Sequence, residues 1–145
     1  MSWRLYFRFA RAVILFSDKP KEVVDVIRYI NCFRKKADLS DEEFRHYWLS
    51  AEYHKLVERV AGLYEVESYA KNLALKVQAT YELIEARGIG EPYDAVLEYW
   101  WNDARDLQKK YESPEARSLF AEMNNYQAQF IDMSRSTAFF TEDDG

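Results

Sequence analysis

The clearest hydrophobic pattern covers residues 93–103, which read YDAVLEYWWND. Side chains of a β-strand alternate between its two faces, so this segment has one apolar, aromatic face and one mixed face. The apolar face carries Ala95, Leu97, Tyr99 and Trp101, and the mixed face carries Asp94, Val96, Glu98 and Trp100. A face of that mixed composition is either solvated or lines a concave site.

Three more segments have the alternation or β-branched and aromatic content of strands. Residues 23–33 predict the first strand, residues 63–72 a second and residues 134–141 the last. In the first of these, Ile27, Tyr29, Asn31 and Phe33 share one face. We expect the strands to pair antiparallel.

Segments whose apolar residues have helical spacing lie between these predicted strands. Ser40 is a good N-cap, and Glu43 completes a capping box for a helix of about residues 40–60 that ends near Gly62. Weaker helical spacing covers residues 73–86. Asn102 or Asp103 begins a helix to about residue 112, and Pro114 begins another to about residue 130.

The first 22 residues form an N-terminal extension to a domain of residues 23–142, and residues 143–145 are a tail. Arg4, Arg8 and Arg11 recur at helical spacing opposite an apolar face. The uninterrupted apolar run of residues 12–16 is too short to span a membrane or to form a signal-peptide core. Three interpretations stay open: a helix docked on the domain or a dimer partner, an interfacial anchor, or residues upstream of the true start.

The order strand, helix, strand, strand, helix, strand predicts an α+β fold. It is the split βαβ, or ferredoxin-like, arrangement: a four-stranded antiparallel sheet with helices on one face and a helical insert. The other face, expected to carry Tyr29, Tyr69 and Trp100, would need a partner to cover it. Two such sheets facing each other give a homodimeric α/β barrel, with a cavity in each subunit between sheet and helices.

The distribution of charged residues argues against a nucleic-acid partner. The net charge is −5, and residues 1–36 carry nine Lys or Arg against three Asp or Glu, which leaves 11 basic and 22 acidic residues in the remainder. An acidic body argues against nucleic-acid binding. With a single cysteine, Cys32, the chain has no internal disulfide, and we expect a cytoplasmic protein with no membrane partner.

Three residues are candidates for acid or base catalysis. Asp94 and Glu98 share a strand face, and in an aromatic pocket desolvation would raise the pKa of either carboxyl toward a useful range. The alternative is that one of them pairs with Arg28 across the sheet. His54 is a candidate general base or haem ligand, or simply a hydrogen-bonded packing residue.

Several side chains are candidates for binding an aromatic molecule by stacking or hydrogen bonding, with core or interface packing as the alternative. They are Tyr29, Asn31, Tyr47, Trp48, Tyr69 and Trp100. The two histidines are eight residues apart without a carboxylate at ligand spacing, so we expect no metal site. Nucleophile-elbow, dinucleotide and P-loop motifs are also absent from the sequence.

Five segments in order resemble the EthD family of dimeric α/β-barrel proteins: LSDEEFRHYW, VESYAKN, YDAVLEYWWND, SPEARSLFAEMNNY and FIDMSRSTAFFTE. Together they span about residues 24–142. The family usually has a histidine four residues after the tryptophan. Here that position is Glu52, and His54 follows two residues later.

The resemblance implies a buried apolar pocket that handles a flat or hydrophobic small molecule. Fungal relatives act as decarboxylases or dehydratases on aromatic polyketides, and related barrels include cofactor-free monooxygenases, isomerases and haem-degrading enzymes. We therefore expect cofactor-independent acid/base chemistry of the lyase or isomerase type, or an oxidoreductase of the cofactor-free monooxygenase type. A non-catalytic carrier, or a haem enzyme with His54 as axial ligand, is the alternative.

Overall fold

The computed structural model describes residues 26–103, 107 and 111–143. The predicted extension of residues 1–22 and most of the helix predicted after Asp103 lie outside these residues. The described elements, in chain order, are β1 (Ile27–Phe33), α2 (Asp41–Trp48), α3 (Ala51–Leu63), β2 (Ser68–Leu73), α4 (Gln78–Arg87), β3 (Ala95–Trp101), α6 (Pro114–Gln127), the 3₁₀ helix η1 (Met133–Arg135) and β4 (Thr137–Glu142).

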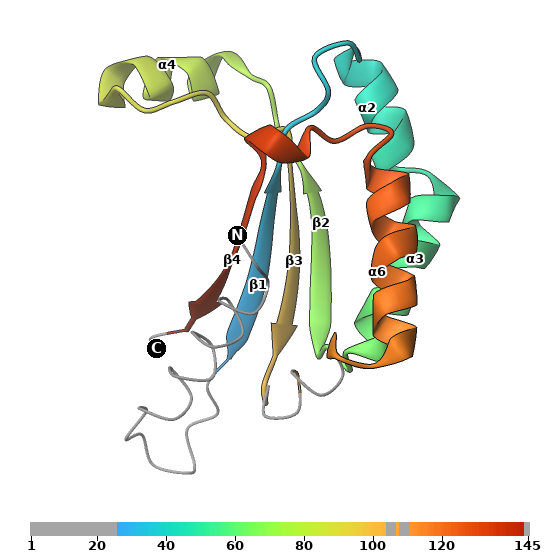
Figure 1. Ribbon diagram of the computed structural model, residues 1–145. Helices are drawn as coiled ribbons and strands as arrows, with labels where there is room; N and C mark the ends of the chain where they lie inside the picture. The colour runs from blue at the N-terminus through green and yellow to red at the C-terminus, as the bar shows by residue number, and fades with distance from the viewer. Residues whose placement is uncertain (1–25, 104–106, 108–110, 144–145) are drawn as a thin grey trace.

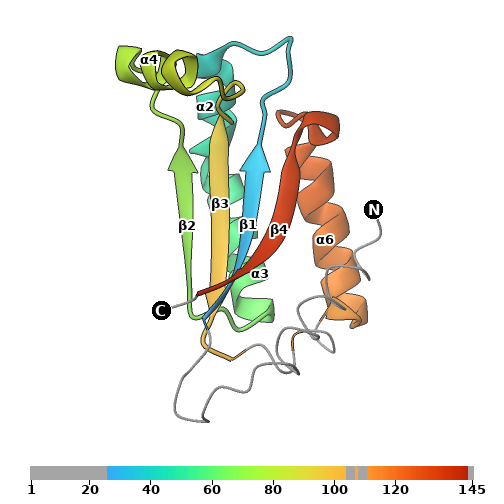
Figure 2. The same cartoon turned by 90° about the vertical axis from the view of Figure 1, so that its left-hand side faces the viewer.

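The four strands form one sheet in the order β2-β3-β1-β4, and neighbouring strands are antiparallel. Helices α2, α3 and α6 lie along one side of the sheet, whereas α4 extends from one end toward the other side (Figure 1). Figure 2 looks onto that other side, where the strands lie in front of the helices. The predicted α+β, ferredoxin-like fold is confirmed.

Burial alternates along the two central strands because only one face of the sheet packs against the helices. The alternating residues of β1 from Ile27 to Phe33, and those of β3 from Ala95 to Trp101, are buried. We call this side the helix-covered face. The opposite side, which α2, α3 and α6 do not cover, is called the open face.

The prediction that Tyr29 and Tyr69 share the open face with Trp100 is wrong. Tyr29 and Tyr69 are both the register partners of Tyr99, on the helix-covered face, whereas Trp100 pairs with Arg28 on the open face. A phenol ring buries a large apolar area while its hydroxyl keeps a polar tip, so a tyrosine fits the interior as well as a wet surface.

The helix predicted for residues 40–60 begins as expected and then divides. The Ser40 Oγ accepts a hydrogen bond from the Glu43 N–H at 3.0 Å, and the Glu43 carboxylate accepts one from the Ser40 N–H at 2.7 Å. The helix ends at Trp48. Ser50 then begins α3, since its Oγ accepts a hydrogen bond from the Tyr53 N–H at 3.1 Å.

Other boundaries differ from the predicted ones by a few residues. Leu63 ends α3, and Glu65, with a φ of 51°, turns the chain so that β2 begins only at Ser68. Helix α6 begins at Pro114 as predicted but ends at Gln127, and η1 precedes β4. Glu65 follows α3, and η1 follows α6. In both helices the apolar spacing continues past the last helical residue, so spacing alone does not mark where the helix ends.

Candidate functional site

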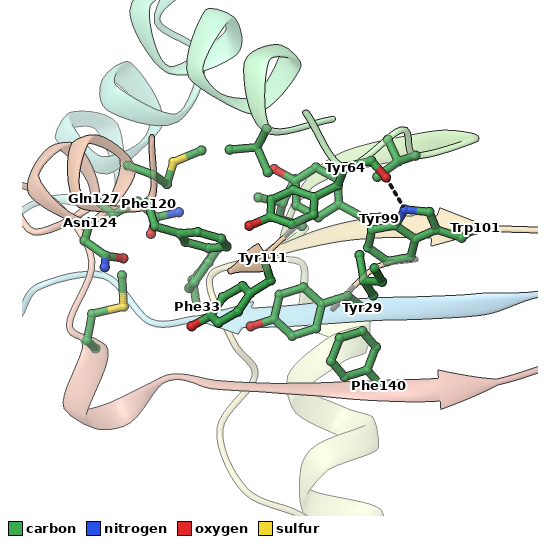
Figure 3. A pocket seen from close by; sticks show the side chains of 16 residues that line it. Tyr29, Phe33, Tyr64, Tyr99, Trp101, Tyr111, Phe120, Asn124, Gln127 and Phe140 are labelled. Carbon is green, nitrogen blue, oxygen red and sulfur yellow. Dashed lines mark hydrogen bonds between the residues drawn. The ribbon is translucent and has the colours of Figure 1, made fainter. Parts of the chain in front are cut away.

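A pocket of about 110 Å³ lies between the helix-covered face of the sheet and helices α3 and α6 (Figure 3). Half of its 16 lining residues are aromatic: Tyr29, Phe33, Tyr64, Tyr99, Trp101, Tyr111, Phe120 and Phe140. Two amides, Asn124 and Gln127, also line it. The lining that the structure describes contains no carboxylate, histidine, lysine or arginine.

The alternation of β3 forms the floor of this pocket, because it directs Leu97, Tyr99 and Trp101 to the helix-covered face. One hydrogen bond joins the floor to α3. The indole Nε1–H of Trp101 donates to the backbone carbonyl oxygen of Tyr64 at 2.8 Å, the dashed line of Figure 3. Both atoms are buried, so the bond fixes the position of the residue that follows α3.

Two tyrosine hydroxyl groups in the pocket wall are buried and have no hydrogen-bond partner in the part of the chain that the structure describes: those of Tyr64 and Tyr99. Burial raises the pKa of both phenols well above the ordinary value for tyrosine. Tyrosine is protonated at neutral pH even without this shift, so both hydroxyl groups keep their protons. With the amides of Asn124 and Gln127 and the hydroxyl groups of Tyr29 and Tyr111, they are polar groups in a largely apolar wall.

Of the six predicted binding residues, Tyr29 alone lines the pocket. Asn31 is buried in β1, where its Nδ2 donates a hydrogen bond to the Leu97 carbonyl oxygen at 3.1 Å. Tyr47 and Trp48 pack in the aromatic core, with Tyr47 stacked on Phe130 at 5.2 Å. Tyr69 lies on β2 beside Tyr99, with ring centroids 6.3 Å apart, and Trp100 lies on the open face.

Asp94 lies outside the pocket lining, at the residue before β3. Its Oδ2 accepts the backbone N–H of Lys35 at 2.8 Å, and its Oδ1 lies 2.9 Å from the Nζ of Lys76. Burial acts to raise the pKa of Asp94, but the Lys35 N–H and the Lys76 ammonium outweigh it and lower the pKa below its ordinary value. The expectation of a raised pKa is therefore wrong for this carboxyl.

The predicted pairing with Arg28 is also wrong for Asp94. Arg28 instead lies 3.8 Å from the Asp143 carboxylate and 5.8 Å from the centre of the Trp100 ring. Glu98 lies on the open face of β3, where it pairs in register with Ile30 and Ala70. Burial, and then the charge of Glu98, raise the pKa of the neighbouring Cys32 thiol.

His54 lies on the outer part of α3, with 52% of its side chain exposed. Its Nε2 is 3.1 Å from the Glu58 Oε1, and its ring centroid is 6.5 Å from that of Tyr69. His54 is not part of the pocket lining. The structure thus brings none of the three predicted catalytic residues to the pocket, and their roles stay predictions.

Sequence reasoning missed most of the pocket wall, above all Tyr64, Trp101, Phe120 and Gln127. One signal was available: Tyr64 continues the apolar stripe of α3 at four residues beyond Val60.

Among the described residues, no group of three His, Cys, Asp or Glu side chains is placed to hold a metal ion. None of the described helices is long and apolar enough to cross a bilayer.

Comparison with known proteins connects the chain to a family. The model of the EthD domain matches residues 36–134. A dimeric protein of unknown function and ferredoxin-like fold from Bacteroides fragilis superposes with a TM-score of 0.52 at 13% identity, covering 81% of this chain and 96% of that one. An EthD family protein from Bacillus halodurans gives a TM-score of 0.52 at 10% identity, covering 81% and 98%. Comparison with curated proteins gives no match.

Proposed function

Because this chain belongs to the EthD family, we propose that it binds a small hydrophobic, aromatic molecule in the pocket between the sheet and helices α3 and α6. One observation carries the proposal: the described lining is half aromatic and contains no charged side chain. Such a lining favours apolar ligands and penalises charged ones, since a charge moved into it loses its hydration without a counter-ion.

The volume of the pocket limits the size of the ligand. An engineered cavity of about 150 Å³ in another protein binds benzene, whereas pockets for drug-sized molecules span roughly 300–1,000 Å³. At about 110 Å³, this pocket suits a molecule of about one ring. Polycyclic compounds and haem exceed that size, and His54, the proposed haem ligand, lies outside the lining. The described residues therefore do not fit haem.

Binding is the part of the function that the lining supports most directly. Cofactor-independent proton transfer or oxygenation of the bound molecule is the enzymatic form of the proposal, with Asp94, Glu98 and His54 as the predicted acids and bases. A non-catalytic carrier is the second candidate. It is favoured because the described lining lacks any acid or base that titrates near neutral pH.

We also propose that the protein is a homodimer in which two open faces meet. On this face Ile30, Val96 and Trp100 are only half-buried, and Phe139 is 40% exposed. An apolar surface of this kind on a soluble domain is ordinarily covered by a partner. The Bacteroides fragilis protein of the same fold is described as dimeric, which supports a second copy of this chain as that partner.

A direct binding experiment tests the proposed function. Ethylbenzene is titrated into the wild-type protein by calorimetry, and into a variant in which Val66→Trp fills part of the pocket. Val66 is half-buried in the pocket wall between α3 and β2, and the neighbouring exposed Glu67→Trp is the matched control. We expect the Val66 variant to lose at least about tenfold in affinity, or about 1.4 kcal/mol, and the Glu67 variant to bind as the wild type does. Equal binding by all three proteins would place the ligand elsewhere.

A further inference from the structure

We propose that Tyr64 and Tyr99 are the polar recognition groups of the pocket, and that their hydroxyl groups donate hydrogen bonds to oxygen on a neutral ligand, a one-ring aromatic carbonyl compound. This inference rests on the proposed function and narrows its ligand class.

Tyr64 and Tyr99 are almost fully buried, with 5% and 4% of their surface exposed. Neither hydroxyl group has a hydrogen-bond partner within the described residues. Buried hydroxyl groups in native proteins are nearly always paired, because an unpaired one destabilises the fold. Two unpaired hydroxyl groups in one pocket wall therefore point to a partner that binds there.

Two neighbouring tyrosines outside the pocket do have hydroxyl partners. The Tyr53 hydroxyl oxygen accepts a hydrogen bond from the Gln127 Nε2 at 3.0 Å, and the Tyr126 hydroxyl lies 2.6 Å from the Ser50 Oγ. Neither Tyr53 nor Tyr126 lines the pocket. The fold supplies partners for these two phenols outside the pocket, whereas the hydroxyl groups of Tyr64 and Tyr99 have none within the described residues.

Both side chains belong to the lining of the pocket. In Figure 3 the rings of Tyr64 and Tyr99 lie among the other side chains that line it. The Trp101 hydrogen bond to the Tyr64 carbonyl oxygen fixes the Tyr64 backbone, and the Tyr64 ring lies 5.7 Å from the Phe120 ring, which also lines the pocket. A ligand ring that packs against the aromatic wall would carry its polar substituent toward these hydroxyl groups.

The acceptor follows from the chemistry of these groups. A tyrosine hydroxyl is protonated at neutral pH, and burial raises the pKa of both phenols further, so each presents an O–H donor. A carboxylate would satisfy such donors, but no cation lines the described pocket to balance its charge. A neutral carbonyl oxygen meets both conditions, because it accepts hydrogen bonds without carrying a charge into an apolar site.

The test compares two ligands of nearly equal size and shape, acetophenone and ethylbenzene, which differ in the carbonyl oxygen. Both are titrated into the wild type, Tyr64→Phe, Tyr99→Phe and the double variant, with Tyr47→Phe as a control outside the pocket. We expect the wild type to prefer acetophenone. Each pocket variant should lose about 3- to 10-fold in affinity for acetophenone, the range of one neutral hydrogen bond, and bind ethylbenzene unchanged or more tightly.

A second readout is independent of affinity. Hydrogen bonding to the phenols should shift the carbonyl stretching band of bound acetophenone to lower frequency, and Tyr99→Phe should reverse part of that shift. If ethylbenzene binds but acetophenone has no advantage, or if the tyrosine variants affect both ligands equally, the phenol site is wrong while the proposed function stands. If neither ligand binds, the proposed function itself is overturned, and this inference with it.

Discussion

The buried indole N–H of Trp101 donates a hydrogen bond to the backbone carbonyl oxygen of Tyr64 at 2.8 Å, across 37 residues of sequence. This bond joins the last residue of β3 to the residue that follows α3, and both residues line the pocket. The sheet and the helix layer are therefore tied together at the pocket wall.

Replacing Trp101 with phenylalanine should destabilise the protein by about 2–3 kcal/mol, because it leaves a buried carbonyl oxygen without a donor and a void where the indole lay. Urea denaturation measures this loss. Trp100→Phe is the matched control on the adjacent residue of the open face, and we expect a loss of about 1 kcal/mol or less. Equal losses in the two variants would show that the hydrogen bond adds little to stability.

Asp94 links three segments, since its carboxylate accepts the Lys35 N–H and pairs with Lys76, which also lies 2.6 Å from Asp41. Burial opposes ionisation, but these partners lower the pKa of Asp94 below its ordinary value. A carboxyl whose pKa is lower in the folded chain than in the unfolded one contributes stability above the unfolded-state pKa of about 3.9. That contribution is lost as the pH falls through the folded-state pKa.

We therefore expect Asp94→Asn to lower the free energy of unfolding by about 1–2 kcal/mol at pH 7, with the difference from wild type shrinking below about pH 4. Because Lys76 is about one-third exposed, with 32% of its side chain accessible, high salt should reduce the effect at neutral pH. Urea denaturation at several pH values measures both trends. The exposed Asp38→Asn is the control and should change stability little. A difference that grows on acidification would contradict the lowered pKa.

The sequence was sufficient for the parts of the fold that depend on neighbouring residues. The period-two pattern around Leu97 and the capping box of Ser40 and Glu43 are local signals. The strand occurs as predicted, and the helix begins where it was predicted to begin. The division of the first helix was missed because Ser50 interrupts it without glycine or proline, inside a continuous apolar stripe.

The face of Tyr29 and the pocket wall depend on contacts between distant segments, so the sequence could not fix them. A tyrosine in an alternating strand is compatible with either face until strand register and helix docking are known. Tyr64, Trp101 and Gln127 come from three elements that meet only in the folded chain. The predicted carboxylates, by contrast, were chosen from one segment alone. Glu98 lies on the open face of β3, and Asp94 lies at the residue before the strand.

The three predicted catalytic residues allow a comparison between binding and turnover. Because none of them lines the described pocket, Asp94→Asn, Glu98→Gln and His54→Ala should each change the affinity for ethylbenzene by less than about twofold, well under 1 kcal/mol. Turnover of a panel of aromatic compounds is measured on the same variants. If ligands bind and all three substitutions leave any conversion unchanged, the acid/base assignment is wrong.

Haem added to the wild type should give no Soret band of a histidine complex.

Helix α4 extends toward the side of the sheet that carries the open face (Figures 1 and 2). None of its residues, all of which the structure describes, is buried, and exposed apolar side chains lie on it and beside it: Leu75, Val77, Tyr81, Leu83 and Ile89. A second copy seated on the open face would give both α4 and the sheet an apolar surface to pack against.

Introducing a charge on the open face should therefore separate the subunits. Trp100→Glu places a carboxylate beside Arg28 and near Glu98 on a surface that would meet its own copy, where like charges from the two subunits repel. We expect sedimentation to show a wild-type dimer at micromolar concentration and a largely monomeric Trp100 variant. Leu49→Glu is the control, because Leu49 is 58% exposed between α2 and α3, and it should leave the dimer intact. A wild-type protein that sediments as a stable monomer would remove the partner from the open face and leave its apolar side chains unexplained.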